Sequence, residues 1–213
     1  FTVDRAGVRT ALQQWVKSRW FAPNALKKVT TAEEVRSTYL PHWTYDASTA
    51  SSYTGERGEY YYETETYTVR DSDGQERTET RQVRKTRWWP ASGHVSRNFD
   101  DVLVRGTSKV PTEHLDALEP WPLPEAKPYD PDYLAGHQTL RYDVEPEQGM
   151  SVAQGRMASV IEQDCRRDIG GDEQRVHSVN TSYSRVMFKL MLLPVFVTWP
   201  DTWLPKPMSP PPM

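Results

Sequence analysis

The sequence contains a single cysteine, Cys165. One cysteine cannot form an internal disulfide, and it excludes an all-cysteine metal site built from this chain alone. We therefore expect a reducing compartment, the cytoplasm. Cys165 lies between Asp164 and Arg166 in an expected helix, and a lone thiol there is interpreted as a small packing residue rather than a nucleophile.

Long apolar runs and nucleotide-binding loops are also missing. No segment approaches the roughly 18 consecutive apolar residues of a membrane span, so we expect no membrane segment in this chain. The phosphate-holding patterns GxxxxGK[ST] and GxGxxG do not occur, which argues against a helicase or a nucleotide-hydrolysing motor. The chain starts at Phe1 without a methionine, and we expect it to be part of a longer protein.

An excess of charge of either sign is absent as well. The net charge is -3 and the isoelectric point is near 6.0, so any binding of nucleic acid would need a local basic patch. The five histidines are far apart and have no paired spacing, so we expect no metal and no cofactor in this chain.

Aromatic residues are abundant, with eight Trp and eleven Tyr, and this argues against a disordered chain. From Trp43 to Trp89 polar and aromatic side chains alternate with the period of a strand. The turn sequence at residues 71–74 then joins two long antiparallel strands. We predict an α+β fold, in which an antiparallel, aromatic-rich β-meander packs against two or three helices.

The chain is expected to form one domain whose character changes along its length. Asp4 caps a first helix that ends near Trp20, a short second helix follows Pro23, and a long helix runs from about Pro146 to Asp168. The expected segments are an N-terminal helical part, 1–38; a β-meander with a short helix, 39–119; a Pro-rich strap, 120–136; a strand-helix-strand unit, 137–199; and a Pro-rich tail, 200–213, expected to be disordered or extended.

A local basic stripe precedes two tryptophans on the second long strand. Its cations can grip phosphates and its indoles can stack bases, which predicts a surface for nucleic acid or another partner. The same cations can instead pair with glutamates across the hairpin and form a solvated, salt-bridged ribbon. The residues of this candidate surface are Arg81, Arg84, Lys85, Arg87, Trp88 and Trp89.

Two further groups of polar residues are candidate sites. In the first, Asp168, Asp172, Glu173 and His177 bind a cation or a basic partner, or Gly-Gly ends the helix and the acids solvate the loop. The second has the residue types of a hydrolase, His94 with Asp100 and Asp101, but neighbours on a strand face opposite ways and a GxSxG elbow is missing. Its alternative interpretation is a turn at residues 93–94 between two strands.

Several long motifs resemble a bacterial family whose members are labelled primosomal protein N-prime-like (replication factor Y) or zinc-ribbon-containing proteins. The motifs are WFAPNALKK, YLPHWTYDASTASSYTGERGEYYY, WWPASGHVSRNFDDVLV, EPWPL, YLAG, CRRDIGGDEQRVHS and LLPV, and they cover most of residues 1–199. The resemblance implies that the chain corresponds to the region downstream of N-terminal zinc ribbons. Zinc is thereby implied for the parent protein and not for this chain, and a role in replication restart is implied by the label.

We therefore expect a non-catalytic binding or scaffold module attached to zinc ribbons, which contacts a protein or nucleic acid. The alternative is an enzyme or a small-ligand site around His94, Asp100 and Asp101, or around the loop from Asp168 to His177. A binding ribbon keeps its cations and aromatic rings exposed, whereas an active site gathers buried acids and histidines in a cleft.

Overall fold

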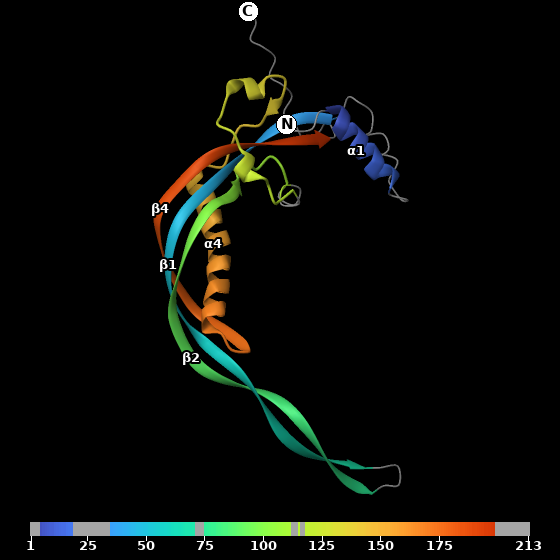
Figure 1. Ribbon diagram of the computed structural model, residues 1–213, viewed down its shortest axis with the longest axis vertical. Helices are drawn as coiled ribbons and strands as arrows, with labels where there is room; N and C mark the ends of the chain where they lie inside the picture. The colour runs from blue at the N-terminus through green and yellow to red at the C-terminus, as the bar shows by residue number, and fades with distance from the viewer. Residues whose placement is uncertain (1–4, 19–34, 71–74, 112–114, 116–117, 199–213) are drawn as a thin grey trace, which may run out of the picture. The chain divides into compact units, whose positions relative to one another are not determined.

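The computed structural model describes residues 5–18, 35–70, 75–111, 115 and 118–198, and in them the chain is mainly β (Figure 1). Its helices are α1 (Arg5–Lys17) and α4 (Pro146–Ile169), with 3₁₀ turns η1 (Leu123–Glu125) and η2 (Pro131–Leu134) in the Pro-rich strap. Its strands are β1 (Val35–Arg70), β2 (Glu76–Arg105), β3 (Gln138–Thr139) and β4 (Glu173–Thr198). Neither described helix is long and apolar enough to span a bilayer.

One mixed sheet contains all four of these strands. Its order is β2-β1-β3, and β4 pairs with β1 as well. β3 runs parallel to β1, with Thr38 opposite Gln138. Because β1 has β2 on one side and β4 on the other over much of its length, β1 is the central strand of the sheet.

Cross-strand hydrogen bonds show that β2 and β4 both run antiparallel to β1. Between β1 and β2 the partner of Glu65 is Arg81 and the partner of Thr49 is Arg97, so the two strands are traversed in opposite directions. Between β1 and β4 the order is opposite too, since Ser51 bonds Thr181, Thr54 bonds Ser178, and Ser48 accepts from Ser184.

The expected α+β class is wrong, because the long strands continue through positions that the sequence marks as breaks. β1 has 36 residues and includes Pro41, Gly55 and Gly58, and β2 has 30 residues and includes Pro90 and Gly93. The expected turn at residues 93–94 is therefore absent, and the sheet is mixed rather than purely antiparallel. The expected short helices after Pro23 and near residues 112–117 lie, wholly or largely, outside the described residues, as does the tail 200–213.

The chain divides into two compact units that alternate along the sequence. Unit 1 consists of residues 1–44, 103–151 and 188–213, and unit 2 consists of residues 45–102 and 152–187. In unit 1 one cluster of the buried core is aliphatic, and partly buried hydrophobic side chains pack against it. Its members are Leu40, Val110, Leu115 and Val195, with Trp121, Leu140 and Val197 beside them.

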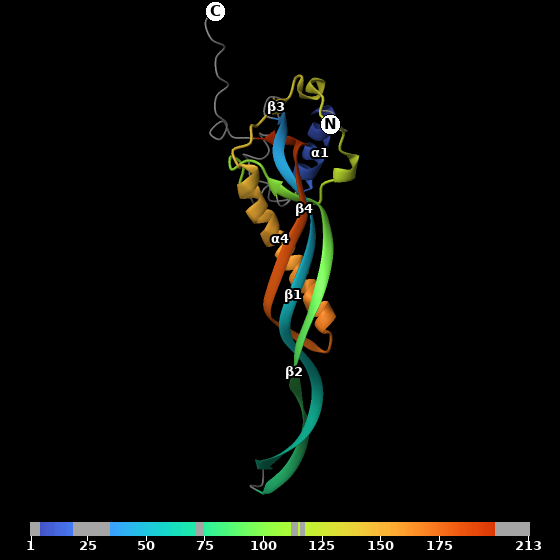
Figure 2. The same cartoon turned by 90° about the vertical axis from the view of Figure 1, so that its left-hand side faces the viewer.

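In unit 2 one stripe of α4 packs on the sheet, where the helix lies along the strands in both views (Figures 1 and 2). The stripe repeats every four residues, which keeps its members on one side of the helix. Its members are Ala153, Met157, Ile161, Cys165 and Ile169, each at most 4% exposed. The prediction that Cys165 is a packing residue is confirmed, and burial raises the pKa of its thiol.

Beyond the start of β4, the strands β1 and β2 continue as a twisted two-stranded ribbon (Figure 1). β4 begins at Glu173, whose carboxylate accepts a hydrogen bond from Tyr60. The residues past this contact, 61–70 and 76–85, are called the arm. Both of its faces carry mainly exposed side chains, so no core stabilises it within the described residues. An isolated two-stranded ribbon is marginally stable in water, and the arm therefore depends on its cross-strand pairs.

Candidate binding surfaces

The predicted basic stripe lies on the arm and at its base, and its cations contact acids of the opposite strand. Arg81 lies 3.2 Å from a carboxylate oxygen of Glu65. Lys85 lies 2.5 Å from Glu63 and 3.4 Å from Glu65. Hydrogen bonds from Arg81 and then Lys85 lower the pKa of Glu65, and the bond to Glu63 raises the pKa of Lys85. Arg81 and Lys85 are thus paired with acids rather than free to neutralise phosphates.

Aromatic rings of β1 cover most of the remaining guanidinium groups. Arg84 lies 4.2 Å from the ring centre of Tyr60 and Arg87 lies 4.9 Å from that of Tyr61. These distances fall within the range of cation–π attraction. At the base of the arm, Trp88 is covered by the guanidinium of Arg175 at 3.7 Å, whereas Trp89 is 51% exposed.

The end of α4 and the loop to β4 bring Asp168 to Tyr53, and both Asp172 and Glu173 to Tyr60. Tyr53 donates a 2.7 Å hydrogen bond to Asp168, and burial followed by this bond raises the pKa of Tyr53 to about 12. The carboxylate of Asp172 accepts from the backbone N–H of Tyr60 at 2.7 Å. Glu173 accepts from the Tyr60 hydroxyl at 2.9 Å. These acids therefore attach the loop to β1 and do not converge on one point.

The fourth residue of this candidate site, His177, lies on β4 near a different acid. Its Nε2 is 3.5 Å from Glu56, which Arg175 also contacts at 3.4 Å. The loop itself is built by Gly170 and Gly171, whose φ angles of 65° and 76° lie in the left-handed region. Two such residues end the helix and reverse the chain, as Gly-Gly after a helix predicts.

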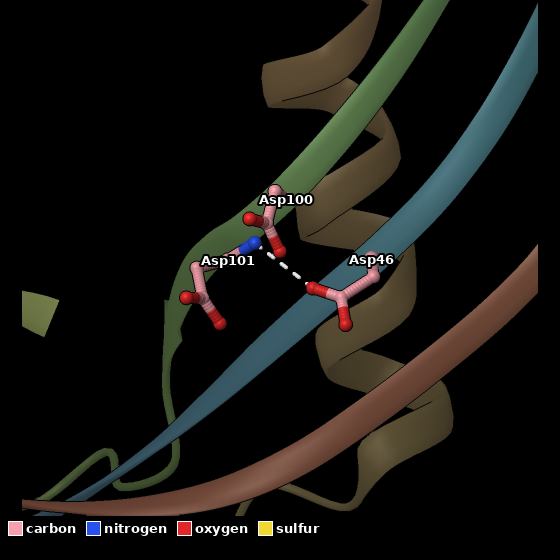
Figure 3. A group of neighbouring side chains, drawn as sticks. All are labelled: Asp46, Asp100 and Asp101. Atoms are coloured by element: carbon pink, nitrogen blue, oxygen red, sulfur yellow. Dashed lines mark hydrogen bonds between the residues drawn. The ribbon is translucent and has the colours of Figure 1, made fainter. Parts of the chain in front are cut away.

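The hydrolase-like residues do not gather. His94 and Asp100 lie on the same strand six positions apart, and at about 3.3 Å per residue this separates them by about 20 Å. Asp100 and Asp101 instead adjoin Asp46 of β1, which the sequence analysis did not select (Figure 3). An enzyme site built from His94 with these acids has no support in this arrangement.

A β-bulge accounts for the three neighbouring aspartates. Asp101 has a φ of 52°, and its N–H donates to the Asp46 carboxylate at 2.9 Å (Figure 3). Two residues of β2 thus oppose one residue of β1, which is the definition of a bulge. The carboxylate oxygens lie within 4.8 Å of one another, but Asp46 is already used by the backbone of Asp101. Oxygen ligands of this kind suit hard cations, which take six or more of them.

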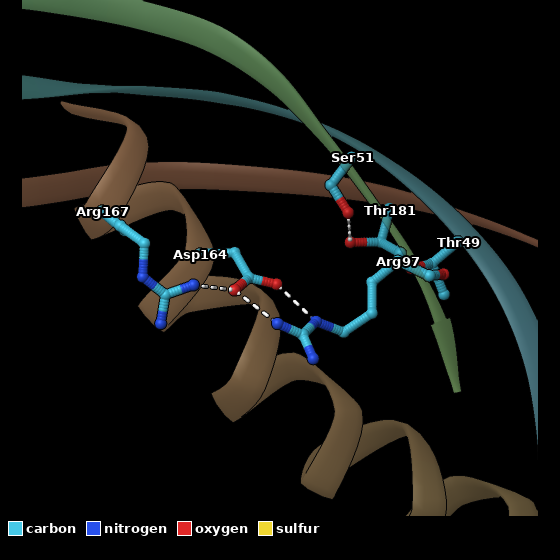
Figure 4. Close-up of polar contacts among 6 residues, drawn as sticks. All are labelled: Thr49, Ser51, Arg97, Asp164, Arg167 and Thr181. Atoms are coloured by element: carbon cyan, nitrogen blue, oxygen red, sulfur yellow. Dashed lines mark hydrogen bonds and ion pairs between the residues drawn. The ribbon is translucent and has the colours of Figure 1, made fainter. Parts of the chain in front are cut away.

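A polar clamp joins β2 to α4 (Figure 4). Arg97 holds both carboxylate oxygens of Asp164, through Nε at 2.6 Å and Nη2 at 2.7 Å, and Arg167 reaches the same carboxylate at 2.9 Å. The hydrogen bond from Arg97 is the main cause that lowers the pKa of Asp164. Beside the clamp lies an open groove of about 580 Å³, lined by residues 95–98 and by Asp164, Arg167 and Asp168.

The clamp predicts a pH-dependent contribution to stability. Because the pKa of Asp164 is lower in the folded chain, its charge stabilises the fold above the usual carboxyl pKa of about 3.9, and this contribution is lost as the pH falls through the folded value. Asp164→Asn should lower the thermal midpoint by a few degrees at pH 7 and by progressively less below pH 4. Thermal unfolding of both chains from pH 7 to pH 3 measures this, and a difference that is constant with pH would contradict it.

Comparisons with known proteins give one weak relative. The Uncharacterized protein YdjG of Bacillus subtilis (strain 168) is 21% identical to this chain over 211 residues. The alignment covers 92% of this chain and 54% of the relative, so the chain spans about half the length of the curated relative it matches. Neither a family model nor a solved structure matches the chain.

Proposed function

We propose that this chain is a non-catalytic binding module and that it recognises a protein partner through the arm. The observation that carries the proposal is the chemistry of the arm's two faces. Opposite residues of antiparallel strands share a face, so the pair Glu65 and Arg81 defines one face, that of the odd-numbered residues, and the even-numbered residues define the other. The first face is mainly ionic and its pairs are already made. The second, called the neutral face, carries no charge at positions 62–68 and 78–82, which lie between the ion pair Arg70–Glu76 and Arg84.

The neutral face is rich in threonine and has one prominent aromatic ring. All of its members on the arm are exposed, and Tyr62 is 64% exposed. β-branched and aromatic side chains on the pleated surface of a strand suit contact with another protein, and tyrosine is enriched where proteins meet. Its uncharged members are Tyr62, Thr64, Thr66, Thr68, Thr78, Thr80 and Gln82.

Nucleic acid is the less favoured partner for the same reason. Nucleic-acid binding that does not read the base sequence needs cations that neutralise phosphates. A protein that binds in this way therefore has a basic face. Here Arg81 and Lys85 contact glutamates, while Arg84 and Arg87 lie over tyrosine rings. On the neutral face Arg70 is paired with Glu76, and the positions between this pair and Arg84 offer no cation.

Attachment to zinc ribbons in a longer protein, and a link to replication restart, belong to this proposal through the family resemblance alone. The partial coverage of the relative is consistent with a module of a longer protein. The name of the relative mentions neither zinc nor replication, and no family model matches the chain.

Site-specific photo-crosslinking tests the arm as a protein-binding surface. A benzophenone amino acid in place of Tyr62 should give adducts of discrete mass in bacterial cells that produce the protein. The matched control places the same amino acid at Tyr129, which is 68% exposed and lies in unit 1. Adducts at both positions alike, or at neither, would overturn the proposal.

A shortened arm provides the second control. Replacing residues 65–81 by Asn-Gly joins Thr64 to Gln82, which are opposite in the register, through a two-residue hairpin turn. This chain should unfold within a few degrees of the original, because the removed residues are exposed, and it should lose the adducts made by a benzophenone at Tyr62.

Salt-dependent binding of single-stranded and duplex DNA tests the other class of partner. We expect no binding that depends on the basic stripe. The comparison chain replaces Arg81, Arg84, Lys85 and Arg87 by alanine. DNA binding that weakens with salt and disappears in this variant would replace the protein partner by nucleic acid.

A further inference from the structure

The outer edge of β2 is open in unit 2. β2 ends the order β2-β1-β3 and pairs only with β1 among the strands that the structure describes. An open edge presents unpaired backbone N–H and C=O groups, and these pair readily with another strand. Pro90, which has no N–H, and the bulge at Asp100 and Asp101 limit the regular part of this edge to residues 91–99.

The groove of about 580 Å³ runs beside this same edge. Four consecutive residues of β2, 95–98, form one wall, and Asp164, Arg167 and Asp168 of α4 form the other. A groove between an edge strand and a helix is the shape in which an extended segment adds to a sheet.

Charges in the groove are mixed in sign. The two arginines of the clamp, Arg97 and Arg167, are balanced by Asp164 and Asp168. Asp164 already accepts three hydrogen bonds, whereas the side chain of Arg167 is 74% exposed and uses one of its nitrogens in the clamp. A ligand of a single charge is poorly matched to this groove, but a surface that itself carries both signs is well matched.

We propose that two copies of this chain associate through the β2 edge, with residues 91–99 of each copy paired as antiparallel strands about a two-fold axis. A two-fold interface places the same patch on both sides and must be complementary to itself. Because the clamp lies beside residues 95–98, the axis brings the two grooves, each with two arginines and two aspartates, next to one another. The sheet of unit 2 then continues across both copies. This assembly is independent of the arm and its partner.

A cysteine scan tests the pairing. Ser92, His94, Ser96 and Asn98 are exposed on one face of β2, and each is changed to cysteine singly. Each variant is oxidised mildly, first alone and then mixed with an equal amount of another variant. The mixtures detect registers centred on an odd-numbered residue, because two different even-numbered residues are then opposite one another. A disulfide requires Cα atoms within about 7 Å, so one position or one pair should link and the others should not. The native Cys165 is buried and serves as the background.

The matched control lies at the opposite edge of the same sheet. Ser178 and Ser182 of β4 are also exposed, and neither should link after substitution by cysteine. Cross-linking at β4 as readily as at β2, or at no position of β2, would overturn the proposal.

Light scattering measures the mass in solution without a cross-link. The original chain should have the mass of two copies, and the chain with the shortened arm should have it too, which separates this proposal from that of the arm. Arg167→Glu should weaken the association about tenfold, because each groove then carries a net negative charge and the two grooves repel. Arg77→Glu makes the same change in net charge, but at a position on the arm, and should have no effect on the association. A monomeric original chain, or equal effects of the two substitutions, would contradict the proposed interface.

Discussion

Replacing Met157 by alanine should lower the free energy of unfolding by about 2–5 kcal/mol, the range found for large-to-small changes in a core. Met157 is 0% exposed and lies in the middle of the α4 stripe that packs on the sheet of unit 2. The loss combines the transfer of apolar atoms and the cavity left behind, since neighbouring side chains relax only partly. For a chain of this length the thermal midpoint should fall on the order of 10 °C, measured by circular dichroism.

The control for this experiment is Val152, on the same helix. Its side chain is 51% exposed, so Val152→Ala should change the stability by no more than about 0.5 kcal/mol. The sequence alone gives both residues as apolar members of the helix, and only the packing separates them. Equal losses for Val152 and Met157 would contradict the assigned stripe.

Local signals in the sequence predict the two long helices and the last strand. Asp4 begins the expected first helix, and the structure has α1 at Arg5–Lys17. Pro146 and the Gly-Gly pair bound the expected long helix, and α4 spans Pro146–Ile169. The expected last strand is confirmed as β4. These elements are bounded by residues whose backbone preferences are strong, so their positions do not depend on distant contacts.

The lengths of β1 and β2 could not be predicted in this way. Gly58, Pro90 and Gly93 favour turns in isolation, yet each lies within a continuous strand. Gly58 lies where the side chains of Trp88 and Glu173 come within about 3 Å of an added Cβ, so close packing explains it better than a turn. Pairing with a neighbouring strand decides whether such a residue breaks a strand, and pairing is a tertiary property.

The candidate sites show the same division. That the arm's cations pair with glutamates across the hairpin is visible in the sequence as an alternative, but the register is not. Opposite residues have numbers that add up to 146, as in Glu65 with Arg81 and Thr49 with Arg97, and this register also places Asp46 opposite Asp100. The expected turn at residues 71–74 corresponds to a sum of 145, so it would shift every pair by one residue. The clamp between Arg97 and Asp164 has no such signal, since the position of α4 against β2 does not follow from the sequence of either element.

Gly55→Ala is the substitution expected to have the largest effect relative to its size. An added Cβ would lie 2.9 Å from Cδ1 of Ile169 and nearer still to the carbonyl oxygen of Arg175. The end of an isoleucine side chain can move, but a carbonyl of β4 can move only if β4 separates from β1. We expect a loss of about 3 kcal/mol or more, at the upper end of the cost of overpacking. Equilibrium unfolding in urea measures it.

Gly155→Ala makes the same chemical change and should act in the opposite direction. No atom comes within 4 Å of a Cβ added there, and Gly155 lies inside α4, where alanine is favoured over glycine by about 1 kcal/mol. Removing a glycine also restricts the unfolded chain, and this effect is the same in both variants. Changes in stability of opposite sign would therefore show that the loss at Gly55 comes from the close approach of two strands. If Gly55→Ala were also neutral or stabilising, the backbone of β4 could not lie against β1 at this position, and the register between these strands would have to change.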